Sequence, residues 1–270
     1  EGDGLQACLV RLEPDARGVW QAIARSREAV LPDARPLQVA LDGGSDAGHI
    51  AVLAGPDDKR YTHGVLGDAI EATRVLYLER HDLWLLRELT LATPHVFEDN
   101  RLRVWRAGGV GLVAVRSGPR GAQLTLIEAD RAQDKALRIA ALGETIGTSN
   151  RWMSPSSDGQ HLISVHTPHL SGALHGVRRE GDRLLSSPLA KGVSNHAIGA
   201  HELDVAAWLG SRYVLADLQT RRVLRAIDIA TQRELPPLDL PAPLRAISAD
   251  AERKALAVVL GDGSLRVLTT

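Results

Sequence analysis

Short apolar runs alternate with polar turns along almost the whole chain, and within many runs apolar and polar residues alternate one by one. Side chains of a β-strand point alternately to its two faces, so a period of two predicts strands rather than helices. The clearest strand predictions are the alternating run at residues 161–166 and the short, nearly continuous apolar runs at residues 49–54, 74–79, 111–116 and 255–260. Turns rich in Gly and Asp separate such runs, as is typical of hairpins. The pattern predicts an all-β protein.

The predicted strands return in groups. Strand starts near Val96, Ser154, Gly199 and Ala246 are separated by about 45–60 residues, which is the period of a four-stranded propeller blade. A single blade cannot bury both of its faces, whereas radial stacking buries each face against a neighbour. We therefore predict one β-propeller domain over residues 1–270, made of four-stranded antiparallel blades. About five or six blades fit the length, with seven as a further alternative.

The first part of the chain raises two further expectations. Residues 18–26 fit a strand, although Trp20 and Ile23 also fall on one face of a helix, and we favour the strand. We expect the strands before residue 54 to form one small sheet. Because propellers are commonly closed by a strand from the other end of the chain, we expect residues 5–12 to pair beside residues 264–268.

Charge and cysteine content exclude several classes of partner and site. The chain has 32 lysines and arginines against 33 aspartates and glutamates, a formal net charge of -1, so we expect no nucleic-acid partner. Cys8 is the only cysteine, which excludes an internal disulfide and any multi-cysteine metal site. No apolar run approaches the ~18–20 residues of a membrane-spanning helix, so we expect no transmembrane segment.

The start of the chain bears on location. The sequence begins at Glu1, and Met153 is its only methionine. Removal of a signal peptide would explain this start, and a truncation would explain it equally well. We favour the first, and we expect a periplasmic or secreted protein.

Five segments together resemble a known family. They read YTHGVLGDAIE, TPHVFEDNRLRV, IGTSNRWMSP, HTPHLSGAL and SNHAIGAHEL, at residues 61–71, 93–104, 146–155, 166–174 and 194–203. Their order and spacing are similar to those of bacterial FG-GAP/VCBS-repeat proteins, over residues 61–270. The resemblance implies an exported β-propeller related to the integrin head, with calcium loops of the type D-x-D-G-D-G in its blades.

The chain departs from that family in its loops. Where the acidic loops are expected it has residues 99–102, 154–159, 208–211 and 249–252, and none of these offers three closely spaced carboxylates. Calcium prefers several oxygen ligands from one loop. We therefore expect no calcium and no other cofactor, and we interpret the chain as a degenerate member of the family.

Two polar loops carry the candidate binding residues. Asn150, Arg151 and Trp152 combine a planar donor group with an indole face, which suits a carboxylate or a stacked ring. The alternative is structural, with Trp152 packed between blades. Asn195 and His196 form a second such group, which could instead cap its loop.

Histidines add a further set of candidates. His166 and His169 flank Pro168, and His196 and His201 lie five positions apart, so a folded loop could bring several imidazoles together. No cysteine or carboxylate accompanies them at a recognised ligand spacing. We predict that His166, His169 and His196 contribute to binding, with no metal, or else that they hydrogen-bond loop backbones.

Motifs for catalysis are scarce. There is no G-x-S-x-G sequence, and His201-Glu202 lacks the second histidine of H-E-x-x-H. We therefore favour an exported, non-catalytic propeller that serves as a protein-interaction scaffold or as a subunit of an envelope assembly. The alternative is a periplasmic small-ligand-binding protein or enzyme that uses loop residues near the central channel. It predicts that these side chains converge in one pocket.

Overall fold

The computed structural model describes residues 7–252 and 254–269. Within this part of the chain the regular elements are strands β1–β24 and two short 3-10 helices, η1 (Asp46–Gly48) and η2 (Gly64–Leu66). The all-β prediction is confirmed, and residues 18–26 contain strand β2 (Trp20–Arg25) rather than a helix.

The strands form blade-like antiparallel units that follow the chain. Blade one consists of β3 (Leu37–Gln38), β4 (His49–Asp57), β5 (Glu71–Glu79) and β6 (Leu85–Thr90). Blade two consists of β7 (Val96–Phe97), β8 (Arg103–Trp105), β9 (Gly111–Ser117), β10 (Gln123–Ala129) and β11 (Leu137–Leu142). Blade three consists of β12 (Met153–Ser157), β13 (Leu162–His166), β14 (Ala173–Glu180) and β15 (Arg183–Ala190). Strand β7 pairs with both β5 and β9, and β11 pairs with β15, so these blades share one curled sheet.

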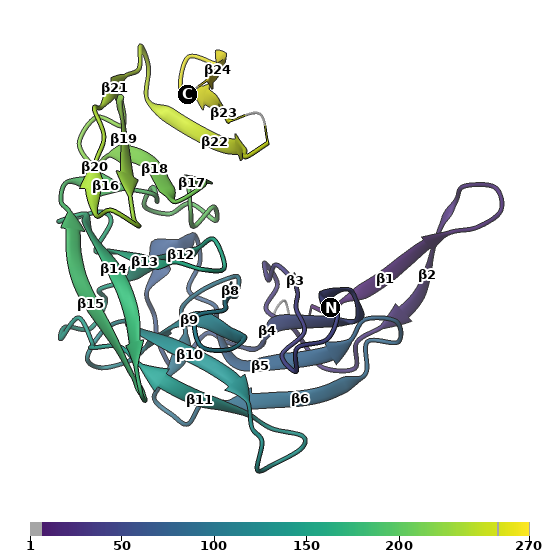
Figure 1. Ribbon diagram of the computed structural model, residues 1–270. Helices are drawn as coiled ribbons and strands as arrows, with labels where there is room; N and C mark the ends of the chain where they lie inside the picture. The colour runs from purple at the N-terminus through teal and green to yellow at the C-terminus, as the bar shows by residue number, and fades with distance from the viewer. Residues whose placement is uncertain (1–6, 253, 270) are drawn as a thin grey trace.

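Two further blades complete the described chain. Blade four consists of β16 (Val193–Ser194), β17 (Ala207–Leu209), β18 (Arg212–Asp217), β19 (Val223–Asp228), β20 (Arg233–Glu234) and β21 (Leu238–Asp239), and blade five of β22 (Leu244–Asp250), β23 (Ala255–Leu260) and β24 (Leu265–Thr269). In Figure 1 the blades follow one another around an arc, with β12 toward its centre and β15 on its outer side. The fold is a β-propeller, and its described strands make five blades, the last of them three-stranded.

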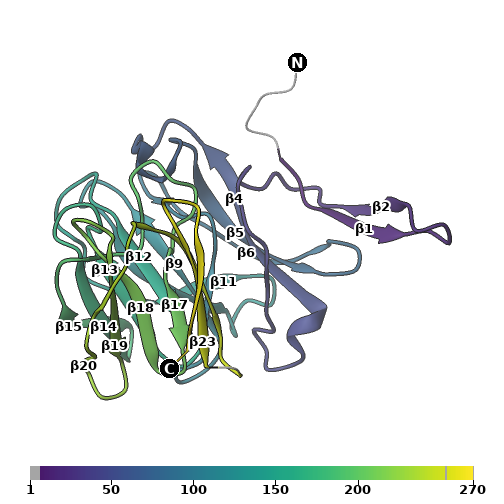
Figure 2. The ribbon, with the colours of Figure 1, turned by 90° about the horizontal axis from the view of Figure 1, so that it is seen from above.

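The arc stays open between blade five and the start of the chain (Figure 1). Strand β1 (Val10–Pro14) pairs with β2 as a separate hairpin that projects from the blades in Figure 2, and among the described residues β24 pairs only with β23. The expected closure by residues 5–12 is therefore wrong for residues 7–12, and residues 5 and 6 lie outside the described part. The expectation of one small sheet before residue 54 is also wrong, because β3 and β4 belong to blade one.

A local turn explains why the hairpin forms. The Asp15 carboxylate accepts hydrogen bonds from the backbone N–H groups of Arg17 (2.8 Å) and Val19 (3.0 Å). Such side-chain to backbone bonds stabilise a tight turn. Pairing two strands across a short turn costs far less chain entropy than pairing across the whole chain. The N-terminal strand therefore pairs with its sequence neighbour.

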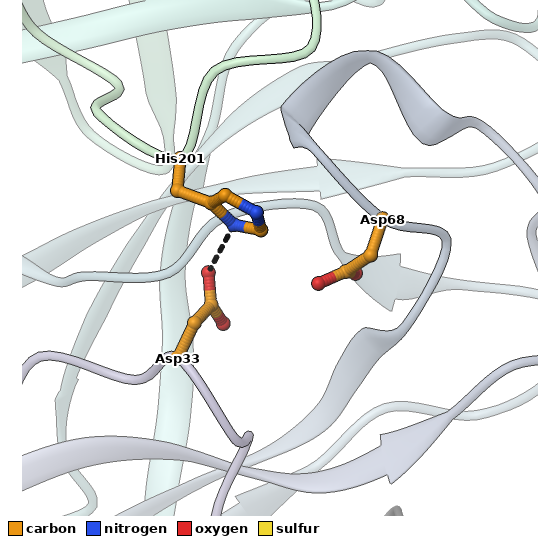
Figure 3. A group of neighbouring side chains, drawn as sticks. All are labelled: Asp33, Asp68 and His201. Carbon is orange, nitrogen blue, oxygen red and sulfur yellow. Dashed lines mark ion pairs between the residues drawn. The ribbon is translucent and has the colours of Figure 1, made fainter.

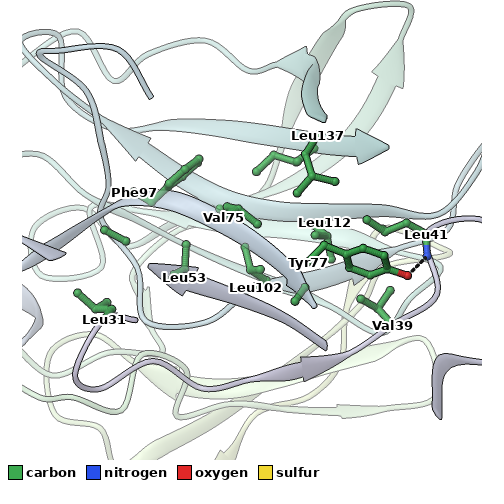
Figure 4. Packing of buried hydrophobic residues seen from close by; sticks show 14 of the residues in the cluster. Leu31, Val39, Leu41, Leu53, Val75, Tyr77, Phe97, Leu102, Leu112 and Leu137 are labelled. Atoms are coloured by element: carbon green, nitrogen blue, oxygen red, sulfur yellow. Dashed lines mark hydrogen bonds between the residues drawn. The ribbon is translucent and has the colours of Figure 1, made fainter. Parts of the chain in front are cut away.

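The core lies between the blades. The strands of blades one and two bury a shared apolar cluster that includes Leu53, Tyr77, Phe97 and Leu112 (Figure 4). The Tyr77 hydroxyl accepts a hydrogen bond from the backbone N–H of Leu41 at 3.3 Å, so its polar end is satisfied inside this cluster. Radial stacking thus buries both faces of a middle blade. No helix in the described residues has the length and apolar character needed to cross a membrane.

Candidate functional site

Four of the predicted binding residues meet at one small pocket, which we call the loop-face pocket. Its volume is about 170 Å³, and its walls are His63, Val65, Asn150, Arg151, Trp152, Thr167, Pro168, His169, Leu170 and Ile198. These residues come from η2 and the position before it, from the loop that precedes β12, from the loop between β13 and β14, and from the loop that follows β16. Blade stacking therefore brings together loops that are far apart in the sequence.

Trp152 forms the buried wall of the pocket. Its indole is 2% exposed, and its Nε1–H donates a hydrogen bond to the backbone oxygen of Glu98 at 2.9 Å. The indole also contacts His196 edge to face, with ring centroids 5.0 Å apart. Trp152 is therefore buried as the structural alternative predicts, and it also lines the pocket, while its role in binding stays a prediction.

His169 and His196, next to Trp152, form a hydrogen-bonded pair. His196 Nε2 lies 2.7 Å from the backbone oxygen of Ala200, so this nitrogen carries a proton. In the neutral ring Nδ1 is then an acceptor, and it receives a hydrogen bond from His169 Nε2 at 2.7 Å. Burial, followed by the neighbouring His196, lowers the pKa of His169 to about 4, and burial also lowers the pKa of His196. Both rings are therefore neutral at pH 7.

Beside the pocket lies a group that the sequence did not reveal. His63 Nδ1 contacts the buried carboxyl group of Glu98, and the hydroxyl of Ser117 donates a hydrogen bond to the same carboxyl. Burial raises the pKa of Glu98, and its contacts with His63 and Ser117 oppose that rise. His63 and Glu98 lie inside two of the segments singled out in the sequence, but nothing in their spacing predicts that they touch.

The rim of the pocket is apolar and carries one positive charge. Leu170 is 63% exposed and Ile198 is 74% exposed, which places both among the most exposed large apolar side chains of the described residues. Arg151 is also exposed, and no ion pair joins it to an acidic group in the described chain. The site can therefore offer apolar contacts together with an unpaired guanidinium.

Two predicted binding residues lie elsewhere. His166 ends β13 and stacks on His175 with ring centroids 4.1 Å apart, away from the pocket walls. Asn195 is fully buried, and its Nδ2 donates to Ser154 Oγ (2.9 Å), Asp204 Oδ1 (2.8 Å) and the Tyr213 hydroxyl (3.0 Å). Asn195 therefore fastens blade three to blade four, because a buried amide must find partners and these blades supply them.

A larger groove of about 700 Å³ runs along the outer part of blade three and the ends of its neighbours. It is lined by Trp105, His161, Arg178, Arg179 and Gln232, among others, and by none of the predicted binding residues. Its ionisable groups have ordinary surface partners, such as Asp158 for His161 at 2.9 Å. We therefore take the loop-face pocket as the candidate site.

Comparisons with known proteins add little to this picture. No protein-family model matches the chain, and no curated protein matches it. Among solved structures, BamB from Moraxella catarrhalis is 14% identical with a TM-score of 0.49, and the match covers 93% of this chain. BBS1N, solved in complex with ARL6DN, is 15% identical with a TM-score of 0.47, over 98% of this chain and 83% of its own. The chain spans 63% of the length of the BamB chain.

Proposed function

We propose that this protein is a non-catalytic β-propeller scaffold that binds a protein partner at the loop-face pocket. The observation that carries the proposal is the exposure of Leu170 and Ile198 at the rim of a pocket whose inner wall is the buried Trp152. Exposed apolar side chains gathered around a concave site are typical of protein-binding surfaces.

The size of the pocket supports a protein rather than a metabolite. Sites for small molecules usually measure about 300–1,000 Å³. At about 170 Å³, this pocket can hold one apolar side chain, while the rim contacts the surface around it. The unpaired guanidinium of Arg151 favours a partner with a carboxylate close to that side chain.

The loops around the pocket are tied to neighbouring segments by hydrogen bonds, which suits recognition. The backbone N–H of Asn150 donates to the Tyr61 hydroxyl at 2.8 Å, that of Thr167 to the Trp152 oxygen at 3.0 Å, and that of Gly199 to the Val65 oxygen at 2.9 Å. A surface that is already ordered loses little entropy when it binds. The histidine pair supports the same role, because both nitrogens of His196 are engaged within the protein.

Location and family are part of the proposal. A periplasmic or secreted protein, and membership of a larger envelope assembly, remain expectations from the sequence, as does the resemblance to FG-GAP/VCBS-repeat proteins. Fractionation of the source cells tests the location directly: the protein should appear in the envelope or secreted fraction, and recovery only from the cytoplasm would contradict it.

The partner test introduces negative charges at Leu170 and Ile198, on the rim of the loop-face pocket. The tagged protein is purified from its own cells together with any stoichiometric partner, and the affinity of the purified partner is then measured by calorimetry. The double variant Leu170→Asp/Ile198→Asp should weaken binding roughly tenfold or more, because apolar contacts at the centre of an interface dominate affinity. Leu265→Asp, at a similarly exposed residue in blade five, is the matched control and should bind normally.

Three outcomes contradict the proposal. In the first, the partner binds the double variant as tightly as the native protein, and in the second only Leu265→Asp weakens binding. In the third, the protein purifies alone and binds a small molecule at the pocket, which would favour the alternative expected from the sequence. Melting curves of all variants check that each remains folded, as expected for surface substitutions.

A further inference from the structure

Three side chains with metal-binding groups meet outside the loop-face pocket. They are Asp33, Asp68 and His201, and one ligand atom from each lies within 4.8 Å of the others (Figure 3). Asp33 precedes β3, Asp68 lies in the loop between η2 and β5, and His201 precedes β17. Three separate segments of the chain therefore converge on one point.

The backbone is shaped to admit the histidine. Gly67 has a φ of 106°, and a Cβ atom built on it would lie 2.7 Å from His201 Cε1 and Nε2. A side chain here would clash with the imidazole where it now lies, and the left-handed backbone at the end of η2 also favours glycine. On its other side, His201 Nδ1 lies 3.7 Å from Asp33 Oδ2.

A buried amide beside the cluster has an unused acceptor. Asn100 is 3% exposed, and its Nδ2 donates both to Asp33 Oδ2 (3.2 Å) and to the backbone oxygen of His201 (2.9 Å). Its Oδ1 is buried without a partner in the described residues. A buried oxygen without a donor is costly, and an ion or a water bound to an ion would satisfy it.

The arginines around the cluster pair with other carboxylates: Arg35 and Arg101 share Glu202, and Arg103 pairs with Asp99. Within the cluster, the group that lies at ion-pair distance from a carboxylate is the His201 imidazole, beside Asp33.

A buried carboxyl group, that of Glu71, interacts electrostatically with the cluster. Glu71 is 2% exposed. Burial, followed by the carboxyls of Glu98 and Asp68, raises the pKa of Glu71 and favours its neutral form. A cation bound at Asp68 would oppose this rise and favour the ionised form.

We propose that Asp33, Asp68 and His201 bind a divalent transition-metal ion, with zinc as the best fit. One imidazole and two carboxylates are a donor set that zinc accepts, whereas calcium prefers oxygen ligands throughout. Zinc bonds to these groups are about 2.0–2.2 Å long, so tetrahedral ligand atoms lie roughly 3.4 Å apart. The ligand atoms lie up to 4.8 Å apart, so metal binding requires the exposed Asp68 and His201 side chains to rotate toward one another, and water would take the fourth position.

The site has a structural consequence for its surroundings. A metal bound there joins the loop after η2 to the loop before β17, and the backbone of Gly199 already bonds to that of Val65 at 2.9 Å. The proposal does not depend on partner binding, because it rests on a different set of residues.

Calorimetry and cobalt spectroscopy test the site directly. The full chain is stripped with a chelator and titrated with Zn²⁺, and separately with Co²⁺, whose visible absorption reports nitrogen and oxygen ligation. We expect one strong site per chain and a rise in melting temperature with Zn²⁺. Asp68→Asn and His201→Asn should each weaken Zn²⁺ binding roughly tenfold to a hundredfold. The amide oxygen in the Asp68→Asn variant can still accept the hydrogen bond from the Ile70 N–H that the Asp68 carboxylate accepts at 2.8 Å.

Two controls separate this site from unspecific binding. Asp134→Asn removes a carboxylate that is 96% exposed and distant in the fold, and His169→Gln removes the histidine pair of the loop-face pocket. Both should bind Zn²⁺ as the native protein does. Three results would each overturn the proposal. The native protein could show no strong Zn²⁺ site, Asp68→Asn and His201→Asn could bind Zn²⁺ with unchanged affinity, or His169→Gln alone could lose binding.

Discussion

Strands in blade four are covered on both faces, whereas those in blade five are covered on one. In β18, Tyr213 and Leu215 pack against blade three, while Val214 and Ala216 pack against blade five. In β23, Leu256, Val258 and Leu260 are buried against blade four, but Ala257 and Val259 between them are exposed. All six residues of β23 are apolar, whereas β18 begins with Arg212 and ends with Asp217. The more apolar strand is therefore the less covered one, so burial is decided by the neighbours of a blade and not by its composition.

The two ends of the chain share this incomplete cover. Leu265 and Val267 of β24 are exposed, as are Leu12 and Trp20 of the β1–β2 hairpin. A blade inside the arc gains stability from two neighbours, while a terminal element gains it from one. Substitutions should therefore cost much more in the middle blades than at the ends, and the following predictions test that contrast.

The largest effect is expected at a buried ion pair. Arg103 pairs with Asp99, and both are buried in blade two. Arg103→Met should lower the free energy of unfolding by about 3–5 kcal/mol, because it leaves a buried carboxylate without its cation. The control, Glu13→Gln, breaks a more exposed pair with Arg11 in the hairpin and should cost less than about 1 kcal/mol. Denaturant unfolding measures both, and equal losses would contradict the contrast.

A matched pair of leucines sharpens the comparison. Leu215 is fully buried between blades three and four, and Leu265 is 66% exposed in blade five. Leu215→Ala should cost about 2–5 kcal/mol through lost burial and a cavity, and Leu265→Ala should stay within about 0.5 kcal/mol. If Leu265→Ala is as costly as Leu215→Ala, blade five is covered in solution by something that the described chain does not show.

The smallest predicted effect concerns pH. Burial, followed by the stacked His175, lowers the pKa of His166 to about 4, from about 6.5 in an unfolded chain. Between these values the unfolded chain binds more protons, so the free energy of unfolding should fall as pH drops from 6.5 toward 4. The contribution of His166 is at most about 3 kcal/mol. His166→Asn should therefore lose less stability than the native protein between pH 7 and pH 4.5, and an identical pH dependence would refute this role.

Much of the local structure could be predicted because short-range chemistry decides it. At the turn between β23 and β24, the Asp262 carboxylate accepts hydrogen bonds from the Ser264 N–H (2.9 Å) and hydroxyl (2.6 Å), which is the hairpin expected there. Short continuous apolar runs likewise mark β4 and β9, and alternation marks β13, within a few positions. Strand β15 carries polar residues on an outer edge, so its pattern is weak and does not predict a strand.

The candidate site could be predicted in part. The run at residues 150–152 was found because an amide, a guanidinium and an indole stand together in a turn-rich loop. His169 and His196 were also named, but their direct hydrogen bond could not be foreseen across 27 positions. His166 ends β13 and stacks on His175 away from the loop-face pocket, whereas His169 lies in the loop that follows, and three positions of sequence do not reveal this separation.

The sequence by itself determined most strands and turns, since each depends on residues within a few positions of one another, and the repeat of such units indicated the propeller class. Only the tertiary structure decided which blades cover each other, where the arc stays open, and which distant side chains meet. Asp33, Asp68 and His201 illustrate the difference: nothing in their spacing relates them, and they adjoin because blade stacking carries three loops to one point. Contacts between segments depend on the sum of many packing interactions, and no single stretch of the chain contains that information.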